Sequence, residues 1–407
     1  MSKKGRGILK MRREEKGITL VALIITIVVM LILVAVSINV IVNSNLIGYS
    51  EKTGDAYSGA IKNEENFGND GITINDKEYA SIDDYIESRK PLPEGAGKKF
   101  TETKEYTDGT KTAVIPGGFT VSGIRKETRI DEGLVIYLIP DDEIENVKWD
   151  GTEKTKYDQF VWIPVSNANK MFMCQAKTES DSGCDLKIEG NEVICQTHKT
   201  ADATKSKNMA GRLYATGAGE SFNSSLTTQT YNANSGLREP AKLSSTNSSF
   251  VDQEEEPNLD LQTEYNNAVK KVIESKGFWI GRYETTGMSS SNDDIAVNIV
   301  AGKGTSDGIG DVNWYRMYKQ QQNYANKKNL DTSKIQSTMI FGAAYDQTMI
   351  FANCEKATTS AKDYSAVITG NVETDCYKNI YDLCGNLREW TTEANNTYYR
   401  ISRGRQL

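Results

Sequence analysis

Hydrophobic positions in this chain fall into one long apolar run followed by many short ones. Residues 18–42 are apolar except for four small polar side chains, namely Thr19, Thr26, Ser37 and Asn39. A helix needs about 20 predominantly apolar residues to cross a bilayer. The run therefore predicts a single N-terminal transmembrane helix, which we place at residues 18–48.

The residues before this run set its orientation. Residues 1–17 form a leader whose charged side chains are mostly basic, and only Glu14 and Glu15 oppose them. Basic segments next to a transmembrane helix stay on the cytoplasmic side. We therefore expect a single-pass protein of a bacterial cell membrane, with a cytoplasmic N-terminus and an extracellular C-terminal domain.

The junction between the leader and the apolar run has a particular form. A secretory signal peptide carries its cleavage site after the apolar segment, whereas here Gly17 precedes it. The segment resembles a type IV prepilin leader, which implies that a prepilin peptidase cuts after Gly17 and methylates Ile18. Pilins usually have glutamate at the fifth mature position, where this chain has Ala22. We therefore expect a pilin-like anchor or a minor pilin in contact with other pilins; a plain single-pass anchor is the alternative.

The rest of the chain alternates short apolar runs with polar stretches. Residues 49–110 are typical of a stalk and linker, with a small hairpin or helical turn at 72–88 and a Pro/Gly-rich segment at 90–99. Runs bounded by turn residues predict strands, and apolar residues at helical spacing predict helices. The strands are expected at 113–121, 133–140, 160–165 and 278–283, and the helices at 264–275, at 312–324 after Asp311, and at 338–351 after Ser337. The polar stretch 174–260 predicts long surface loops. This irregular order favours an α+β domain over a parallel-sheet fold.

The net charge of the chain bears on whether it could bind nucleic acid. The formal net charge is -7, and the basic residues that cluster lie in the leader, where membrane topology explains them. Nucleic-acid binding needs a clustered basic surface. We therefore expect no nucleic-acid partner.

The cysteine and histidine positions in the sequence do not predict a metal site or a catalytic nucleophile. The six cysteines, Cys174, Cys184, Cys195, Cys354, Cys376 and Cys384, include no Cys-x-x-Cys pair, so a structural zinc site is not expected. On an extracellular domain, disulfides among the first three are plausible, and free buried thiols are the alternative. The single histidine, His198, follows Thr197 and precedes Lys199, which predicts a solvated loop position rather than a catalytic one.

Three motifs near the C-terminus carry a resemblance. They are GFWIGRYETT at 277–286, NIYDLCGNLREWT at 379–391 and YRISRG at 399–404. In this order they are similar to the hallmark segments of the formylglycine-generating-enzyme, or sulfatase-modifying-factor, family. The resemblance covers residues 112–407, loosely before Phe278, and implies a C-type-lectin-like fold. It makes Asp382, Gly385, Asn386, Glu389, Trp390, Arg403 and Gly404 fold-maintaining residues.

The same resemblance argues against the family's enzymatic activity. It implies a catalytic cysteine pair after the third motif, and this chain ends at Leu407, with Arg405 in place of a second glycine. We therefore expect a domain that is incomplete at its C-terminus, no catalytic residues and no cofactor. Ca²⁺ held by oxygen atoms of Asp382, Asn386 and Glu389 is the alternative that the resemblance leaves open.

A non-catalytic branch of this family resembles the variable proteins of diversity-generating retroelements, whose ligand-contact residues follow the second motif. The matching stretch here is rich in Asn and Tyr, which suit adaptable recognition. The ligand-binding residues are then expected to be Thr392, Asn395, Asn396, Tyr398, Tyr399 and Arg405.

These observations predict four segments: a leader at 1–17, a membrane helix at 18–48, a stalk and linker at 49–110, and a lectin-like domain at 111–407. The leading hypothesis is a non-catalytic surface or pilus-tethered protein that binds an extracellular protein or glycan. The alternatives are a sulfatase-modifying-type surface enzyme and a minor structural pilin.

Overall fold

The computed structural model describes residues 72–75, 77–79, 81–177, 183–211, 239, 260–302, 312–353, 369–371, 375–383, 386–394 and 400–403. The expected leader and membrane helix, including Gly17 and Ile18, lie outside these residues. Within the described ranges, no helix is both long and apolar enough to cross a bilayer. The chain forms two compact units, Met1–Lys90 and Pro91–Leu407.

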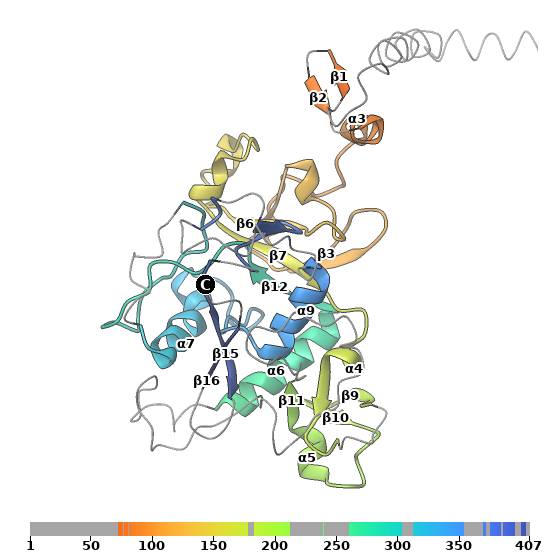
Figure 1. Cartoon of the computed structure of the whole chain (residues 1–407), viewed down its shortest axis with the longest axis vertical. Helices are drawn as coiled ribbons and strands as arrows, with labels where there is room; N and C mark the ends of the chain where they lie inside the picture. The colour runs from red at the N-terminus through yellow and green to blue at the C-terminus, as the bar shows by residue number, and fades with distance from the viewer. Residues whose placement is uncertain are drawn as a thin grey trace, which may run out of the picture. The chain divides into compact units, whose positions relative to one another are not determined.

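The described part of the first unit is small. Strand β1 (Ile72–Ile74) pairs antiparallel with β2 (Lys77–Tyr79), and Asn75 at the turn has a φ of 51°. Helix α3 (Ile82–Arg89) follows. Of the two structures expected for residues 72–88, a hairpin and a helical turn, the chain forms both (Figure 1).

An antiparallel four-stranded sheet lies at the centre of the second unit. Its order is β12 (Gly277–Gly281), β7 (Asp158–Pro164), β6 (Val135–Leu138) and β5 (Thr120–Val121). Val161, Trp162 and Ile163 of β7 are at most 1% exposed, so β7 carries core side chains on both faces. The strands expected at 133–140, 160–165 and 278–283 are thereby confirmed within a few residues.

The expected strand at 113–121 is two strands. β4 (Thr112–Ile115) pairs with β3 (Lys104–Thr107), and β5 joins the main sheet after the turn that begins at Pro116. The segment expected as linker also belongs to the second unit, since the amide of Gly97 donates to the carbonyl of Val121 at 3.0 Å. The second unit therefore begins at Pro91, not near residue 111.

Three of the expected helices form with shifted ends. Helix α6 (Leu261–Ser275) begins at Asp260, whose carboxylate accepts from the Thr263 amide, and buries Tyr265 and Val269. The helix expected at 312–324 is α7 (Trp314–Gln322) followed by α8 (Tyr324–Lys327). Its cap is Asn313, whose side chain accepts from the Arg316 amide, and the expected cap Asp311 lies outside the described residues. Helix α9 (Gly342–Ala352) begins four residues later than expected.

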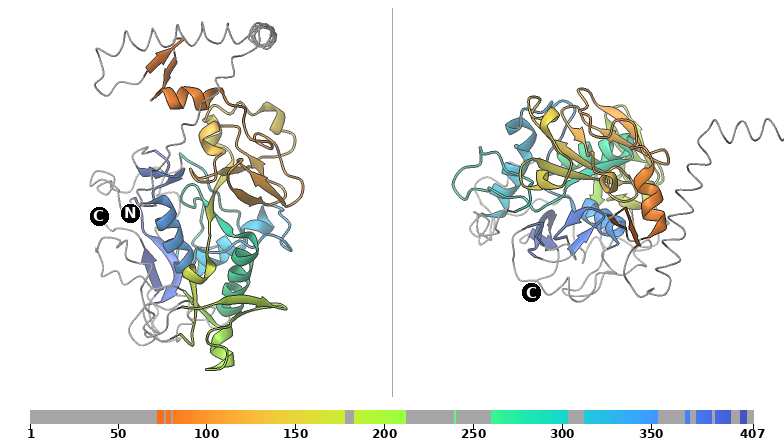
Figure 2. Two further views of the ribbon diagram at one scale, coloured as in Figure 1. Left: turned by 90° about the vertical axis from the view of Figure 1, so that its right-hand side faces the viewer. Right: turned by 90° about the horizontal axis from the view of Figure 1, so that it is seen from above.

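The described part of the expected loop region is folded instead. It contains β8 (Phe172–Cys174), the hairpin of β9 (Leu186–Glu189) and β10 (Glu192–Cys195), helix α5 (Ala203–Lys207) and β11 (Met209–Gly211), which pairs with β8. Figures 1 and 2 show β9, β10 and α5 close together at one end of the second unit. Val193 and Met209 pack in one core cluster with Tyr265 of α6. The polar composition of 174–260 misled the prediction because a few buried apolar and sulfur-bearing side chains suffice to hold these short strands.

The remaining elements are short. They are helix α4 (Ala168–Met171), strands β13 (Cys376–Tyr377), β14 (Ile380–Tyr381), β15 (Glu389–Ala394) and β16 (Arg400–Arg403), and single 3₁₀ turns at Arg125–Glu127, Ile144–Asn146 and Thr152–Thr155. Strands β13 and β14 pair with each other, as do β15 and β16. The second unit therefore mixes helices with antiparallel strand pairs.

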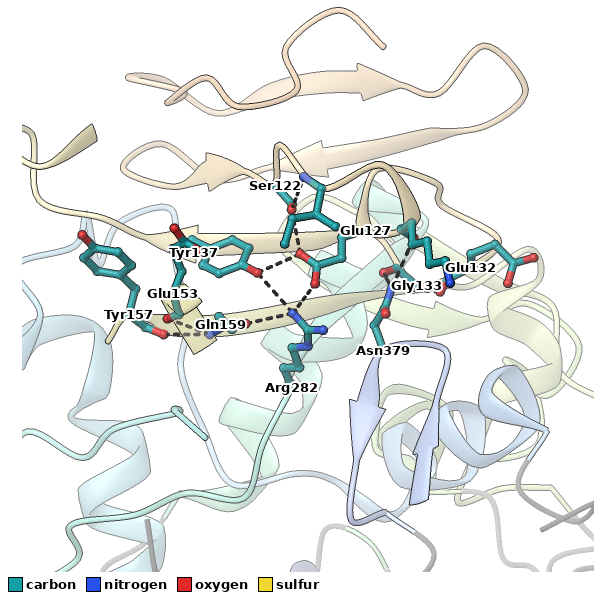
Figure 3. A network of polar contacts seen from close by, with 12 residues as sticks. Ser122, Glu127, Glu132, Gly133, Tyr137, Glu153, Tyr157, Gln159, Arg282 and Asn379 are labelled. Carbon is teal, nitrogen blue, oxygen red and sulfur yellow. Dashed lines mark hydrogen bonds and ion pairs between the residues drawn. The ribbon is translucent and has the colours of Figure 1, made fainter. Parts of the chain in front are cut away.

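A buried arginine ties the sheet together (Figure 3). Arg282, directly after β12, lies 2.7 Å from Glu127, and both side chains are less than 10% exposed. The same carboxylate accepts from Tyr137 of β6 and from Ser122, while Arg282 also donates to Gln159 of β7. One guanidinium thus connects three strands and the 3₁₀ turn that carries Glu127.

A second contact in Figure 3 joins the C-terminal motif to the sheet. The side-chain amide of Asn379 donates to the carbonyl of Gly133 at 2.7 Å. Gly133 has a φ of 90°, and a Cβ there would lie 1.9 Å from the carbonyl oxygen of Lys378. Glycine is therefore required at this position.

Substituting Arg282 with Met should leave Glu127 charged and buried without its partner. We expect a loss of about 3–5 kcal/mol in the free energy of unfolding, as for other broken buried pairs. Denaturant unfolding of the full chain measures this. Arg129→Met is the matched control, because Arg129 is 46% exposed in its pair with Asp131, and should cost less than about 1 kcal/mol. Equal losses of stability in the two variants would contradict a special role for the buried ion pair between Arg282 and Glu127.

Candidate functional site

The hairpin of β15 and β16 carries the stretch expected to bind ligand, and buried charge fixes its two strands together. Arg403 of β16 donates to both carboxylate oxygens of Glu393 on β15, at 2.7 and 2.5 Å. Glu393 is fully buried, and Arg403 also lies 3.8 Å from Asp346 of α9. A bidentate guanidinium–carboxylate pair fixes orientation as well as distance.

The other end of the hairpin is held by an aromatic ring. The Arg400 guanidinium lies 3.9 Å from the centroid of the Trp314 ring and donates to the carbonyl of Thr392 at 2.9 Å. The indole nitrogen of Trp314 in turn donates to the carbonyl of Thr391 at 2.8 Å. Helix α7 thus positions both strands where they lead into residues 395–399.

Most of the expected ligand-binding residues lie outside the described residues, namely Asn395, Asn396, Tyr398, Tyr399 and Arg405. The exception, Thr392, is fully buried, and its hydroxyl donates to Glu239 at 2.5 Å. Thr392 therefore supports the hairpin from within and is not available as a surface contact.

Glu239 links this hairpin to the start of α9, and it was not among the residues predicted from the sequence. Its carboxylate accepts from the amides of Gly342 and Ala343, at 2.5 and 2.9 Å, and so satisfies amides that the first turn of a helix leaves unpaired. Burial, together with the nearby Glu393 charge, raises the pKa of Glu239 to about 8. A Cβ on Gly342 would lie 2.0 Å from the Glu393 side chain, so only glycine fits there.

The motif residues expected to maintain the fold occupy a second buried acidic region. Asp382 accepts from the hydroxyl of Thr369 and the amide of Gly370, and Asn386 donates to Glu284 at 2.7 Å. Burial, reinforced by Asp382, raises the pKa of Glu284 to about 8 and that of Asp375 to about 7. Burial also raises the pKa values of Asp382 and of Glu389.

The remaining motif residues lie elsewhere or outside the described residues. Trp390 packs partly buried against the core cluster around Trp314, and Arg403 forms the ion pair given above. Gly385 and Gly404 lie outside the described residues. The Ca²⁺ alternative involves Asp382, Asn386 and Glu389. Among the described residues, their acidic side chains do not form a group of three or more Cys, His, Asp or Glu ligand atoms within 4.8 Å of one another.

Four ligand atoms converge at the end of the β9–β10 hairpin. The Nδ1 atom of His198 lies 3.2 Å from Cys174 Sγ, 3.7 Å from Cys184 Sγ and 3.1 Å from Cys195 Sγ. All four atoms lie within 4.8 Å of one another, and among the described residues no other group of three or more Cys, His, Asp or Glu side chains does so. We call this set the Cys/His cluster.

One expectation about these residues is wrong, and one open alternative is decided. His198 is 6% exposed and faces the three thiols, whereas a solvated loop position was expected. Cys174, Cys184 and Cys195 are buried thiols without a disulfide, which matches the alternative that the sequence left open. Cys354 and Cys384 lie outside the described residues.

The Cys/His cluster was not predicted because the sequence contains no Cys-x-x-Cys pair. The available signal was Cys195-x-x-His198, with two more cysteines in the 21 residues before Cys195. A hydrogen bond from Cys184 lowers the pKa of Cys174 to about 5, and burial raises the pKa of Cys195.

Comparison with known proteins adds nothing to this picture. The chain matches no protein-family model, no curated protein and no solved structure.

Burial of Glu239 predicts a pH dependence. Its folded pKa of about 8 lies above the ordinary value of 4.5, so between these values the folded chain holds a proton that the unfolded chain releases. The free energy of unfolding should therefore fall as pH rises from about 5 to about 8, by a few kcal/mol, and then level off.

The Glu239→Gln variant should show a smaller fall, and urea unfolding across this pH range measures it. Glu102→Gln is the matched control, since that side chain is 72% exposed, and should keep the wild-type slope. An unchanged slope in Glu239→Gln would contradict the buried, protonated state of this carboxyl group.

Proposed function

We propose that this chain is a non-catalytic, membrane- or pilus-tethered surface protein whose second unit, with a C-type-lectin-like fold, binds an extracellular protein or glycan. The ligand face is the connection between β15 and β16, residues 395–399. The observation that carries the proposal is the fixing of both strands of this hairpin by buried charge.

The proposal is supported first by the paired strands β15 and β16, which we call the base of the hairpin. Arg403 pairs with Glu393, and Arg400 stacks on Trp314, so charged groups hold β16 to β15 and to α7. Thr391, Thr392 and Glu393 are fully buried. A base that packs independently of the connection lets that connection change in sequence without loss of the fold.

The composition of the connection supports recognition. Residues 395–399 are Asn, Asn, Thr, Tyr and Tyr. Tyrosine offers a large contact area with few rotatable bonds, and Asn and Thr offer adaptable hydrogen bonds. This is the chemistry of protein and glycan contacts, and it suits the variable position of a retroelement-diversified protein.

The locus offers a direct test of diversification. Sequencing past the Leu407 codon in many cells should reveal a reverse transcriptase gene and a near-repeat that differs only at adenines over codons 391–405. An extended reading frame that encodes a downstream cysteine pair, without such a repeat, would favour the formylglycine-generating activity instead.

Binding can be tested on the protein itself. A variant with Asn395, Asn396, Tyr398 and Tyr399 replaced by Ala should lose at least about tenfold in affinity for whichever glycan or protein the wild type selects from an array, since central aromatic contacts dominate binding. Its unfolding midpoint should stay near that of the wild type, because the base of the hairpin is intact.

The matched control replaces Ser290 and Asn292, which lie on an exposed polar loop, and should keep full affinity. Retained binding by the first variant, or equal loss in the control, would place the ligand face elsewhere.

A further inference from the structure

The Cys/His cluster is assembled by three separate segments that the fold holds in place. Cys174 ends β8, Cys184 precedes β9, and Cys195 ends β10 with His198 three residues later. The two flanks of the β9–β10 hairpin are joined beyond the strands, since the amide of Gln196 donates to the carbonyl of Asp185 at 2.8 Å. This contact places Cys184 beside Cys195 and His198.

The separations match those of a tetrahedral zinc site. With Zn–S bonds of about 2.3 Å and a Zn–N bond of about 2.0–2.1 Å, two sulfur ligands lie about 3.8 Å apart and a sulfur and a nitrogen about 3.5 Å apart. Cys174 Sγ and Cys184 Sγ are 3.7 Å apart, and the three sulfur–nitrogen distances run from 3.1 to 3.7 Å. A disulfide would need about 2.05 Å between two sulfur atoms.

A backbone amide also contacts one of the sulfur atoms. The amide of Cys174 donates to Cys184 Sγ at 3.2 Å. Hydrogen bonds of this kind favour the thiolate form, and partners outside the ligand set orient metal ligands. This amide contact therefore helps to orient Cys184 within the cluster.

The cluster is closed to solvent. Cys174 and Cys195 are fully buried, and His198 and Cys184 are 6% and 7% exposed. Four protein ligands leave no coordination position for water or substrate, which is typical of a structural rather than a catalytic zinc ion.

We propose that Cys174, Cys184, Cys195 and His198 bind one structural Zn²⁺ ion. The three cysteines coordinate as thiolates, their protons pass to solvent, and His198 coordinates through Nδ1. The ion joins β8 to the β9–β10 hairpin and so stabilises the part of the second unit that packs on α6. On an extracellular domain it would also keep three neighbouring cysteines from forming disulfides. This assignment does not depend on the proposed ligand face.

The test is metal analysis of the full chain, extracted in detergent without chelator. We expect about one zinc per chain by elemental mass spectrometry. Exchange of the ion for Co²⁺ should give the visible absorption of tetrahedral cobalt with thiolate charge transfer. Alkylation of the zinc-loaded chain should spare Cys174, Cys184 and Cys195 until a chelator is added.

Two variants locate the ion. Cys195→Ser should reduce zinc to a small fraction of one per chain, whereas Cys376→Ser, outside the Cys/His cluster, should retain it. Less than stoichiometric zinc in the wild type after incubation with Zn²⁺, or a mass two hydrogen atoms lower with a disulfide between cluster cysteines, would overturn the proposal. Both of these readouts use the wild-type chain and hold even if Cys195→Ser fails to fold.

Discussion

Burial of charged side chains in matched pairs is the constraint on which this fold depends. Arg282 and Glu127 meet between the sheet and a 3₁₀ turn, Lys328 and Asp158 meet at the start of β7, and Arg403 and Glu393 meet in the C-terminal hairpin. A buried charge is costly without its partner, so each pair favours one arrangement of the elements that carry it over its alternatives. The first two pairs connect elements that are distant in sequence, and the third joins neighbouring strands, which helps to explain how short strands keep fixed positions.

The same constraint gives the sequence motifs a physical meaning. Arg282 and Glu284 belong to the first motif, Asn379, Asp382 and Asn386 to the second, and Arg403 to the third. Asn386 donates to Glu284 across 102 residues of sequence, and Arg282 donates to Gln159 of β7. Polar contacts thus connect the first motif to the second motif and to the sheet.

Local pattern predicted the local elements well and the distant contacts poorly. The apolar runs at 133–140, 160–165 and 278–283 predicted strands because buried central strands need continuous apolar side chains. Glu239 could not be found in this way, since its partner Thr392 is 153 residues away in the sequence. His198 seemed solvated because its sequence neighbours are polar, yet the turn of chain beyond β10 directs it inward to three thiols. Burial that arises from tertiary contacts leaves no periodic signal in the sequence.

We expect buried charge to make the C-terminal hairpin part of the same cooperative unit as the sheet. Amide hydrogen exchange of the full chain, followed by mass spectrometry of peptides from β15 and β7, tests this most directly. We predict that the amides of Thr391, Thr392 and Glu393 exchange only through the opening that also exposes Val161 to Ile163, with the same free energy. Rapid exchange in β15 while β7 stays protected would show that the hairpin opens on its own, and would contradict this expectation.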